Sequence, residues 1–122
     1  MATIDINADT FEKSITENDI VVIDLWADWC GPCKMFGPIF EKSSDQHPDV
    51  VHAKLDTDAN QQLAGALDVR GIPTLMAFRE GVLVFNQAGA LPAKALEQVI
   101  AAVKELDMDK VRARTHESAA AG

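Results

Sequence analysis

The residues of this chain that could do chemistry gather in one short stretch, Trp29-Cys30-Gly31-Pro32-Cys33-Lys34. It contains the only two cysteines of the chain, with two residues between them. Two thiols at this spacing can close a small disulfide ring, or one can resolve a mixed disulfide that the other has formed. Half of a zinc site is a second possibility, but zinc needs four ligands, and His47, His52 and His116 show no paired spacing. A structural disulfide is a third.

The segments on either side predict that the cysteines lie where a buried strand ends and a helix begins. Residues 20–27 form an almost continuous apolar run, and residues 34–46 carry apolar side chains at helical spacing. Cys30 is therefore expected at the helix N-terminus, where backbone N–H groups and the helix dipole favour a thiolate. Lowering a thiol pKa by about 1.5 units makes roughly half of it reactive at neutral pH. A CxxC pair beside a βαβ pattern thus favours redox chemistry over the other two possibilities.

The rest of the pattern predicts an α/β domain with the element order β-α-β-α-β-α-β-β-α. Helices between the early strands imply parallel pairing, whereas a hairpin turn at Glu80-Gly81 implies an antiparallel edge. We therefore expect a mixed central β-sheet with helices on both faces. Asn7 and Asp9 are the expected caps of the first helix. Residues 1–106 are expected to form the domain, and residues 107–122 a C-terminal extension that passes from frayed helix into disorder.

Bulk composition narrows the classes of function. The chain has 122 residues and a formal net charge of −8, and the charges of the last sixteen residues cancel. An acidic body without a basic patch argues against nucleic acid or an anionic membrane as a partner. No secretory signal and no apolar run of transmembrane length is visible. Cysteines confined to one CxxC suit a reducing cytosol, so a cytoplasmic monomer is expected.

Asp24 stands out because it lies in the middle of the apolar run that predicts the central strand. A buried carboxylate is costly unless it is neutral or paired. Burial raises the pKa of such a group, which suits a residue that takes or gives a proton near pH 7. A structural aspartate, satisfied by neighbouring hydroxyl or backbone groups, is the alternative. We favour proton transfer.

Three segments resemble the landmarks of the thioredoxin family. Residues 22–34 are similar to the family's active-site segment, and Gly71-Ile72-Pro73-Thr74 and Gly89-Ala90-Leu91 resemble its second and third motifs at the expected separations. The resemblance covers about residues 3–106. It implies the thioredoxin fold and the activity of a general protein-disulfide reductant. It also implies no bound cofactor, with reducing equivalents coming from NADPH through a flavin-dependent thioredoxin reductase.

The same resemblance implies roles for the central residues. Cys30 would be the exposed nucleophile and Cys33 the more buried resolving thiol, and together they would form the redox-active disulfide. Asp24 would lie behind Cys33 and assist its deprotonation. Lys54 matches the family's lysine near that aspartate and is expected to pair with it, although a solvated strand lysine is the alternative. Independently of the resemblance, the position of Lys34 beside Cys33 could give a thiolate weak electrostatic support, although an exposed helix lysine that does little is the alternative.

Substrate docking is also implied by the resemblance. The family holds the proline at position 73 in the cis form, where it keeps metals from the thiols. The backbone of Ile72 would pair with a strand of the substrate. A flat apolar rim around Cys30 is expected, with Trp29 in it rather than in the core. Its members would be Trp29, Gly31, Pro32, Ile72 and Gly89.

Two other functions stay open at this point. One keeps the fold but reverses the direction, as a disulfide oxidant or isomerase. Oxidising relatives usually carry a histidine between the cysteines, whereas this chain has Gly31-Pro32 there, as the reducing members do. The other is a binding or chaperone-like module that uses the apolar rim without turnover.

Overall fold

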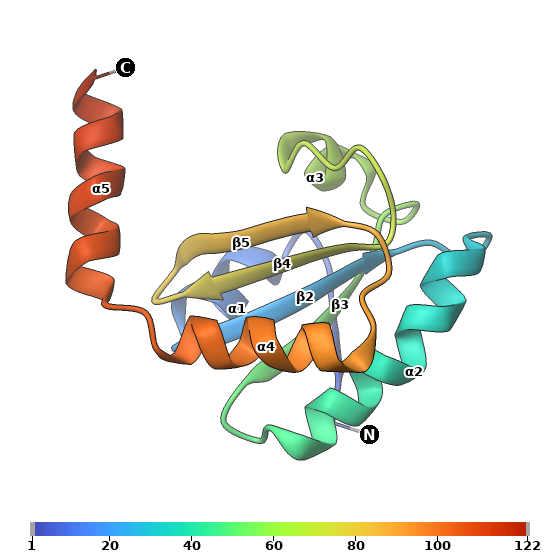
Figure 1. The fold of residues 1–122 in the computed structure, drawn as a ribbon. Helices are drawn as coiled ribbons and strands as arrows, with labels where there is room; N and C mark the ends of the chain where they lie inside the picture. The colour runs from blue at the N-terminus through green and yellow to red at the C-terminus, as the bar shows by residue number, and fades with distance from the viewer. Residues whose placement is uncertain (1, 122) are drawn as a thin grey trace.

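The structure is a computed structural model that describes residues 2–121 of the chain. Its elements follow the predicted order and add one helix at the end (Figure 1). They are β1 (Ile4–Ile6), α1 (Phe11–Thr16), β2 (Ile20–Trp26), α2 (Gly31–Gln46), β3 (Val51–Asp56), α3 (Gln61–Ala66), β4 (Thr74–Arg79), β5 (Val82–Ala88), α4 (Ala93–Lys104) and α5 (Met108–Ala121).

The strands form one five-stranded sheet in the order β1-β3-β2-β4-β5. β3 pairs with β1 and β2 in parallel, whereas β4 is antiparallel to both β2 and β5. The mixed sheet is thus confirmed. The β4–β5 hairpin turns at Glu80 and Gly81, whose φ angles of 51° and 80° suit the twist of a tight hairpin. This topology places β2, the strand that leads to the cysteines, at the centre of the sheet.

Hydrophobic residues on both faces of the sheet are buried by helices. Alternate side chains of β2 point to opposite faces: Val22 packs with residues of α2 and α4, whereas Ile23 and Leu25 pack with α1 and α3. Figure 1 shows α2 and α4 in front of the sheet and α1 behind it. Asp24 has the same parity as Val22, so its side chain belongs to the face that α2 covers.

The start of α1 differs from the prediction. Thr10 is its N-cap residue and makes no side-chain capping bond, whereas Asn7 and Asp9 were the expected caps. The Asn7 carboxamide oxygen instead accepts hydrogen bonds from the backbone N–H groups of Asp9, at 2.9 Å, and Thr10, at 3.1 Å. An Asn-closed turn therefore precedes the helix, because this side chain bonds readily to backbone two residues on.

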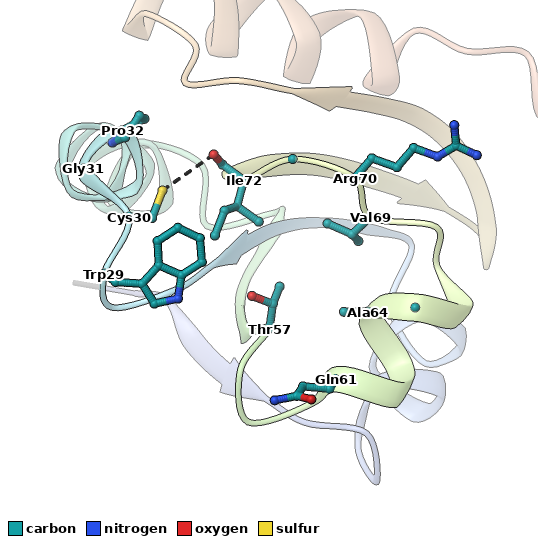
Figure 2. A pocket seen from close by; sticks show the side chains of 12 residues that line it. Trp29, Cys30, Gly31, Pro32, Thr57, Gln61, Ala64, Val69, Arg70 and Ile72 are labelled. Atoms are coloured by element: carbon teal, nitrogen blue, oxygen red, sulfur yellow. Dashed lines mark hydrogen bonds between the residues drawn. The ribbon is translucent and has the colours of Figure 1, made fainter.

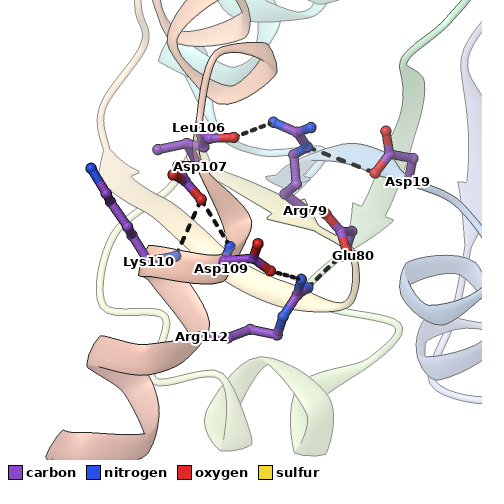
Figure 3. A network of polar contacts seen from close by, with 8 residues as sticks. All are labelled: Asp19, Arg79, Glu80, Leu106, Asp107, Asp109, Lys110 and Arg112. Carbon is purple, nitrogen blue, oxygen red and sulfur yellow. Dashed lines mark hydrogen bonds and ion pairs between the residues drawn. The ribbon is translucent and has the colours of Figure 1, made fainter.

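Helix α5 is tied to the β4–β5 hairpin by polar contacts (Figure 3). Arg112 donates to Glu80 at 2.7 Å and to Asp109 at 3.2 Å, and the carboxylate of Asp107 accepts from two N–H groups of the first turn. Arg79 donates to three carbonyl oxygens at the end of α4. The backbone is helical as far as Ala121, and Gly122 lies outside the described residues. A separate domain over 1–106 with an extension over 107–122 stays a prediction.

Candidate active site

Cys30 is the N-cap residue of α2, as its position after the central strand predicts. Its backbone is extended, with φ −88° and ψ 112°, and its sulfur accepts a hydrogen bond from the backbone N–H of Cys33 at 3.2 Å. Pro32, in the first helical turn, has no N–H to offer. One amide donor and the positive end of the helix dipole therefore act on the Cys30 sulfur, and both favour the thiolate over the thiol.

The structure holds Cys30 and Cys33 as a disulfide, with their Cα atoms 5.2 Å apart. The expected contrast between an exposed and a buried cysteine is wrong for this state, because the exposed fractions are 4% and 5%. Trp26 and Ile72 pack against the cluster that the two cysteines form with Ala27. What differs between the two residues is the cavity that each one lines.

Cys30 lines an open cavity of about 580 Å³ between α2, α3 and the segment before β4 (Figure 2). Trp29 forms one wall and is 70% exposed, and the Cys30 sulfur lies 3.6 Å from the carbonyl oxygen of Ile72. That oxygen can accept from the thiol once the disulfide is reduced. The lining residues are Trp29, Cys30, Gly31, Pro32, Thr57, Gln61, Ala64, Gly65, Val69, Arg70, Gly71 and Ile72.

Most of the expected rim therefore comes together around Cys30, but two of the residues expected to dock substrate do not line this cavity. Gly89 lies next to Pro73, whose carbonyl oxygen accepts a hydrogen bond from the Gly89 N–H at 2.8 Å. The Ile72–Pro73 peptide bond is cis, as the family resemblance implied. The φ angle of Gly89 is 105°, a value that residues with a Cβ atom rarely adopt. This explains why glycine stands there.

Cys33 lines a second and smaller cavity, of about 160 Å³, on the side of the disulfide that faces the sheet. Its lining is rich in charged side chains, in contrast to the Cys30 side. The lining residues are Asp24, Trp26, Ala27, Asp28, Cys33, Lys34, Gly37 and Lys54. The three residues predicted to assist the thiols by charge or proton transfer thus line one cavity beside Cys33, namely Asp24, Lys54 and Lys34.

Asp24 is 1% exposed, and neither of its carboxylate oxygens has a hydrogen-bond partner among the described residues. Burial raises the pKa of Asp24 to about 7, the charge of Lys54 lowers that pKa, and the charge of Glu41 raises it further. A structural aspartate would need partners for its oxygens. Their absence in the part of the chain described here favours a group that exchanges a proton.

Lys54 lies opposite Asp24 in the β2–β3 register, yet it does not bond to the carboxylate. Its amino nitrogen lies 5.3 Å from the centre of the Trp26 ring, within the range of a cation–π contact. The expected pairing is therefore a through-space influence on the Asp24 pKa rather than a direct ion pair. Lys34 lines the same cavity, and its support of the thiolate stays a prediction.

Sequence reasoning missed one wall of the Cys30 cavity, which comes from the β3–α3 connection and from α3 itself. Gln61, Ala64 and Gly65 face the cavity from α3, and Asp58 accepts a hydrogen bond from the Trp29 indole N–H at 2.9 Å. The only available signal was the polar stretch that follows β3, since functional groups gather at the carboxyl ends of parallel strands.

Comparisons with known proteins agree with this geometry. The thioredoxin family model matches residues 2–102. A putative thioredoxin 2 of Streptomyces coelicolor is 50% identical over 111 residues, which cover 91% of this chain and 83% of that protein. Thioredoxin-1 of Saccharomyces cerevisiae is 43% identical over 95 residues, covering 78% of this chain and 91% of the yeast protein. The chain belongs to the thioredoxin family.

The fold of the chain is also similar to that of solved thioredoxin structures. The solved structure of a mutant thioredoxin from Halobacterium salinarum superposes with a TM-score of 0.78 and 38% sequence identity, over 85% of this chain and 91% of that one. Thioredoxins act by dithiol–disulfide exchange, and in this member Cys30 and Cys33 are the pair that exchanges. In the region 2–121, no helix is long and apolar enough to cross a membrane, and no cluster of His, Cys, Asp and Glu could hold a metal ion.

Proposed function

We propose that this thioredoxin is a general reductant of protein disulfides, with Cys30 as the nucleophile and Cys33 as the resolving thiol. The Cys30 thiolate attacks one sulfur of a substrate disulfide and forms a mixed disulfide, and the other substrate sulfur leaves as a thiolate that takes up a proton. The Cys33 thiolate then attacks the Cys30 sulfur. This releases the second substrate thiol and leaves the Cys30–Cys33 disulfide.

Asp24 is the proposed acceptor of the Cys33 proton. Its carboxylate shares the 160 Å³ cavity with Cys33, and that cavity has room for the water molecules that can carry a proton. A pKa of about 7 means that Asp24 is half ionised at neutral pH and can both take up and return a proton. Lys54 keeps that pKa from rising further, which supports a role for it in tuning Asp24.

The substrate is proposed to dock as an extended segment along the Cys30 cavity. The carbonyl oxygen of Ile72 lies 3.6 Å from the nucleophilic sulfur, so backbone pairing at Ile72 would bring a substrate disulfide to it. Main-chain pairing does not depend on substrate side chains, which supports a broad substrate range. Trp29, Gly31, Pro32, Pro73 and Gly89 complete the proposed docking surface.

The proposed electron source is NADPH, through a flavin-dependent thioredoxin reductase. We further propose that the protein is a cytoplasmic monomer that binds neither nucleic acid nor membrane. The net charge of −8 supports the absence of nucleic-acid partners, and the confinement of both cysteines to one CxxC supports a reducing compartment.

The observation that carries the proposal is the hydrogen bond from the Cys33 N–H to the Cys30 sulfur at the start of α2, beside an open cavity. The first test is the reduction of an insulin-type disulfide by the protein in the presence of dithiothreitol. We expect clear acceleration over dithiothreitol alone. No acceleration would refute the proposed activity.

Two other functions are separated by further measurements. Equilibration with glutathione buffers distinguishes a reductant from an oxidant or isomerase, since about 30 mV corresponds to a tenfold change for a two-electron couple. A binding or chaperone-like role would survive the substitution Cys30→Ser, whereas a reductant would lose its activity.

A further inference from the structure

Trp29 is a large aromatic residue that packing does not hold in place. Its exposed fraction is 70%, yet it lines the Cys30 cavity, and Figure 2 shows its ring beside Cys30. An exposed side chain normally samples several rotamers, and ordering it on binding costs free energy. A contact that fixes the ring beforehand would therefore favour docking.

Such a contact comes from the opposite side of the cavity. The Trp29 indole N–H donates to the Asp58 carboxylate at 2.9 Å, across 29 positions of sequence. Asp58 belongs to the connection between β3 and α3, and α3 supplies the facing wall through Gln61, Ala64 and Gly65. One side-chain bond thus joins the two walls of the cavity.

The connection that carries Asp58 is itself firmly held. Thr57 donates to the carbonyl oxygen of Trp26 twice, from its backbone N–H at 2.9 Å and from its hydroxyl at 3.0 Å. The Asp56 carboxylate accepts from the N–H groups of Asp58 and Ala59, at 3.0 and 3.3 Å. The backbone that carries Asp58 is therefore held by hydrogen bonds on both sides of this residue.

We propose that Asp58 is a positioning residue, which holds the Trp29 ring across the mouth of the cavity and so presets its width for an extended disulfide substrate. This inference rests on the proposed function, because it assigns the cavity to substrate docking. Asp58 acts through Trp29 and takes no part in the exchange of sulfur bonds. Because Asp58 contributes to substrate binding, its loss should raise KM for large substrates. The intrinsic reactivity of the Cys30 thiolate should not change.

The test compares Asp58→Ala and Asp58→Asn with the unmodified protein on two substrates, an insulin-type disulfide and a small aromatic disulfide. For insulin we expect Asp58→Ala to raise KM about 5-fold with little change in kcat, because one hydrogen bond to a charged acceptor is lost. Asp58→Asn keeps an acceptor oxygen and should restore most of the loss. The small disulfide reacts without filling the cavity, so its rate should not change.

Three controls keep the outcome specific. Asp68→Asn removes one negative charge from an exposed carboxylate whose φ angle of 57° asparagine tolerates. Its amide oxygen can still accept the hydrogen bond from Arg70, which lines the cavity, so this variant measures the loss of a nearby charge with that contact kept. Trp29→Phe keeps a ring but lacks the N–H, and adding Asp58→Ala to it should cost nothing more. The side-chain N–H signal of Trp29 in NMR spectra should broaden or shift in Asp58→Ala, whereas that of the buried Trp26 N–H should not.

Different results would refute the proposed function and the positioning role of Asp58. If the unmodified protein reduces neither substrate, the proposed function is wrong. If it reduces both, and Asp58→Ala leaves the insulin KM and the Trp29 signal unchanged, the positioning role alone is overturned. Equal losses in Asp58→Asn, Asp58→Ala and Asp68→Asn would replace positioning by a simple effect of charge.

Discussion

The two cavities that meet at the Cys30–Cys33 disulfide differ in volume and in the charge of the side chains that line them. The Cys30 cavity has a volume of about 580 Å³ and is open, whereas the Cys33 cavity holds about 160 Å³ and contains Asp24, Lys34 and Lys54. The exposed fractions of the two cysteines are nearly equal, at 4% and 5%. The two sulfurs therefore differ in their surroundings rather than in their exposure, and we propose that the surroundings decide which one meets the substrate and which one gives up a proton.

The largest loss of activity is expected when the two sulfurs are removed one at a time. Cys30→Ser is expected to lower insulin reduction by more than about 1,000-fold, because no thiolate faces the open cavity. Cys33→Ser should allow the first attack and then stop, so that a mixed disulfide between Cys30 and the substrate accumulates. Mass spectrometry under non-reducing conditions measures it. If both variants accumulated the mixed disulfide equally, the surroundings of the two cysteines would not decide which one is the nucleophile.

The second prediction concerns the charged cavity alone. Asp24→Asn should slow the release of the mixed disulfide by about 10-fold or more at pH 7, because no carboxylate takes the Cys33 proton. In the unmodified protein this release should accelerate as the pH rises through about 7, the pKa of Asp24. Rapid-mixing measurements on a preformed mixed disulfide report this step. Alkylation of Cys30 in the reduced protein is the control for the open side and should change little by comparison.

The third prediction follows from the cost of burying Asp24 without a hydrogen-bond partner among the described residues. Its pKa of about 7 in the folded chain exceeds the ordinary value of 3.8, so the folded state holds the proton more tightly than the unfolded state. The resulting stability is complete below pH 3.8 and is lost as the pH rises through 7. A pKa difference of about three corresponds to at most about 4 kcal/mol.

Asp24→Asn should therefore raise the free energy of unfolding at pH 8 and leave it almost unchanged near pH 3.5. Urea titrations of the disulfide form at the two pH values measure this difference. A variant that is less stable than the unmodified protein at pH 8 would contradict the burial argument. It would show that the carboxylate is satisfied by partners rather than strained by desolvation.

The smallest expected effect compares one glycine from each cavity. Gly37 lies in α2 beside the Cys33 cavity and Gly65 lies in α3 beside the Cys30 cavity, and an added Cβ would meet nothing within 4 Å at either place. Alanine at each should raise the free energy of unfolding by up to about 1 kcal/mol, because glycine is a poor helix former.

The two alanine variants should differ in activity. Gly37→Ala narrows the smaller cavity and is expected to slow mixed-disulfide release about 2-fold, since proton transfer depends on positioning within it. Gly65→Ala takes up little of the larger cavity and should leave insulin reduction unchanged. Thermal unfolding and the same release assay measure both. A reversed pattern, with Gly65→Ala the slower variant, would show that docking rather than proton transfer responds to small changes of volume.

Much of the site could be predicted because its signals are local in sequence. The apolar run before Cys30 and the helical spacing after it place the sulfur at a helix start, and the structure makes it the N-cap. Asp24 could be recognised because a carboxylate interrupts a buried strand. The cis bond before Pro73 came from the family resemblance alone, since an Ile-Pro bond by itself favours trans.

The parts that could not be predicted depend on contacts between distant segments. The bond between Trp29 and Asp58 spans 29 positions and leaves no periodic pattern in the sequence. The family resemblance placed Lys54 near Asp24, and the strand register puts the two residues opposite each other. The position of Lys54 over the face of Trp26 depends on side-chain geometry that the sequence pattern does not encode. The nearly equal exposure of the two cysteines depends on how Trp26 and Ile72 pack against them, which no local sequence pattern records.

The proline between the cysteines has a consequence for how readily this protein gives up electrons. A sulfur anion at a helix start is normally stabilised by amide hydrogens of the first turn, and Pro32 removes one of them, so that Cys33 alone supplies the bond. Every additional donor would stabilise the reduced form and make the pair a poorer reductant. Because Pro32 withholds one hydrogen, we expect this pair to be a stronger reductant than it would be with an N–H donor at that position.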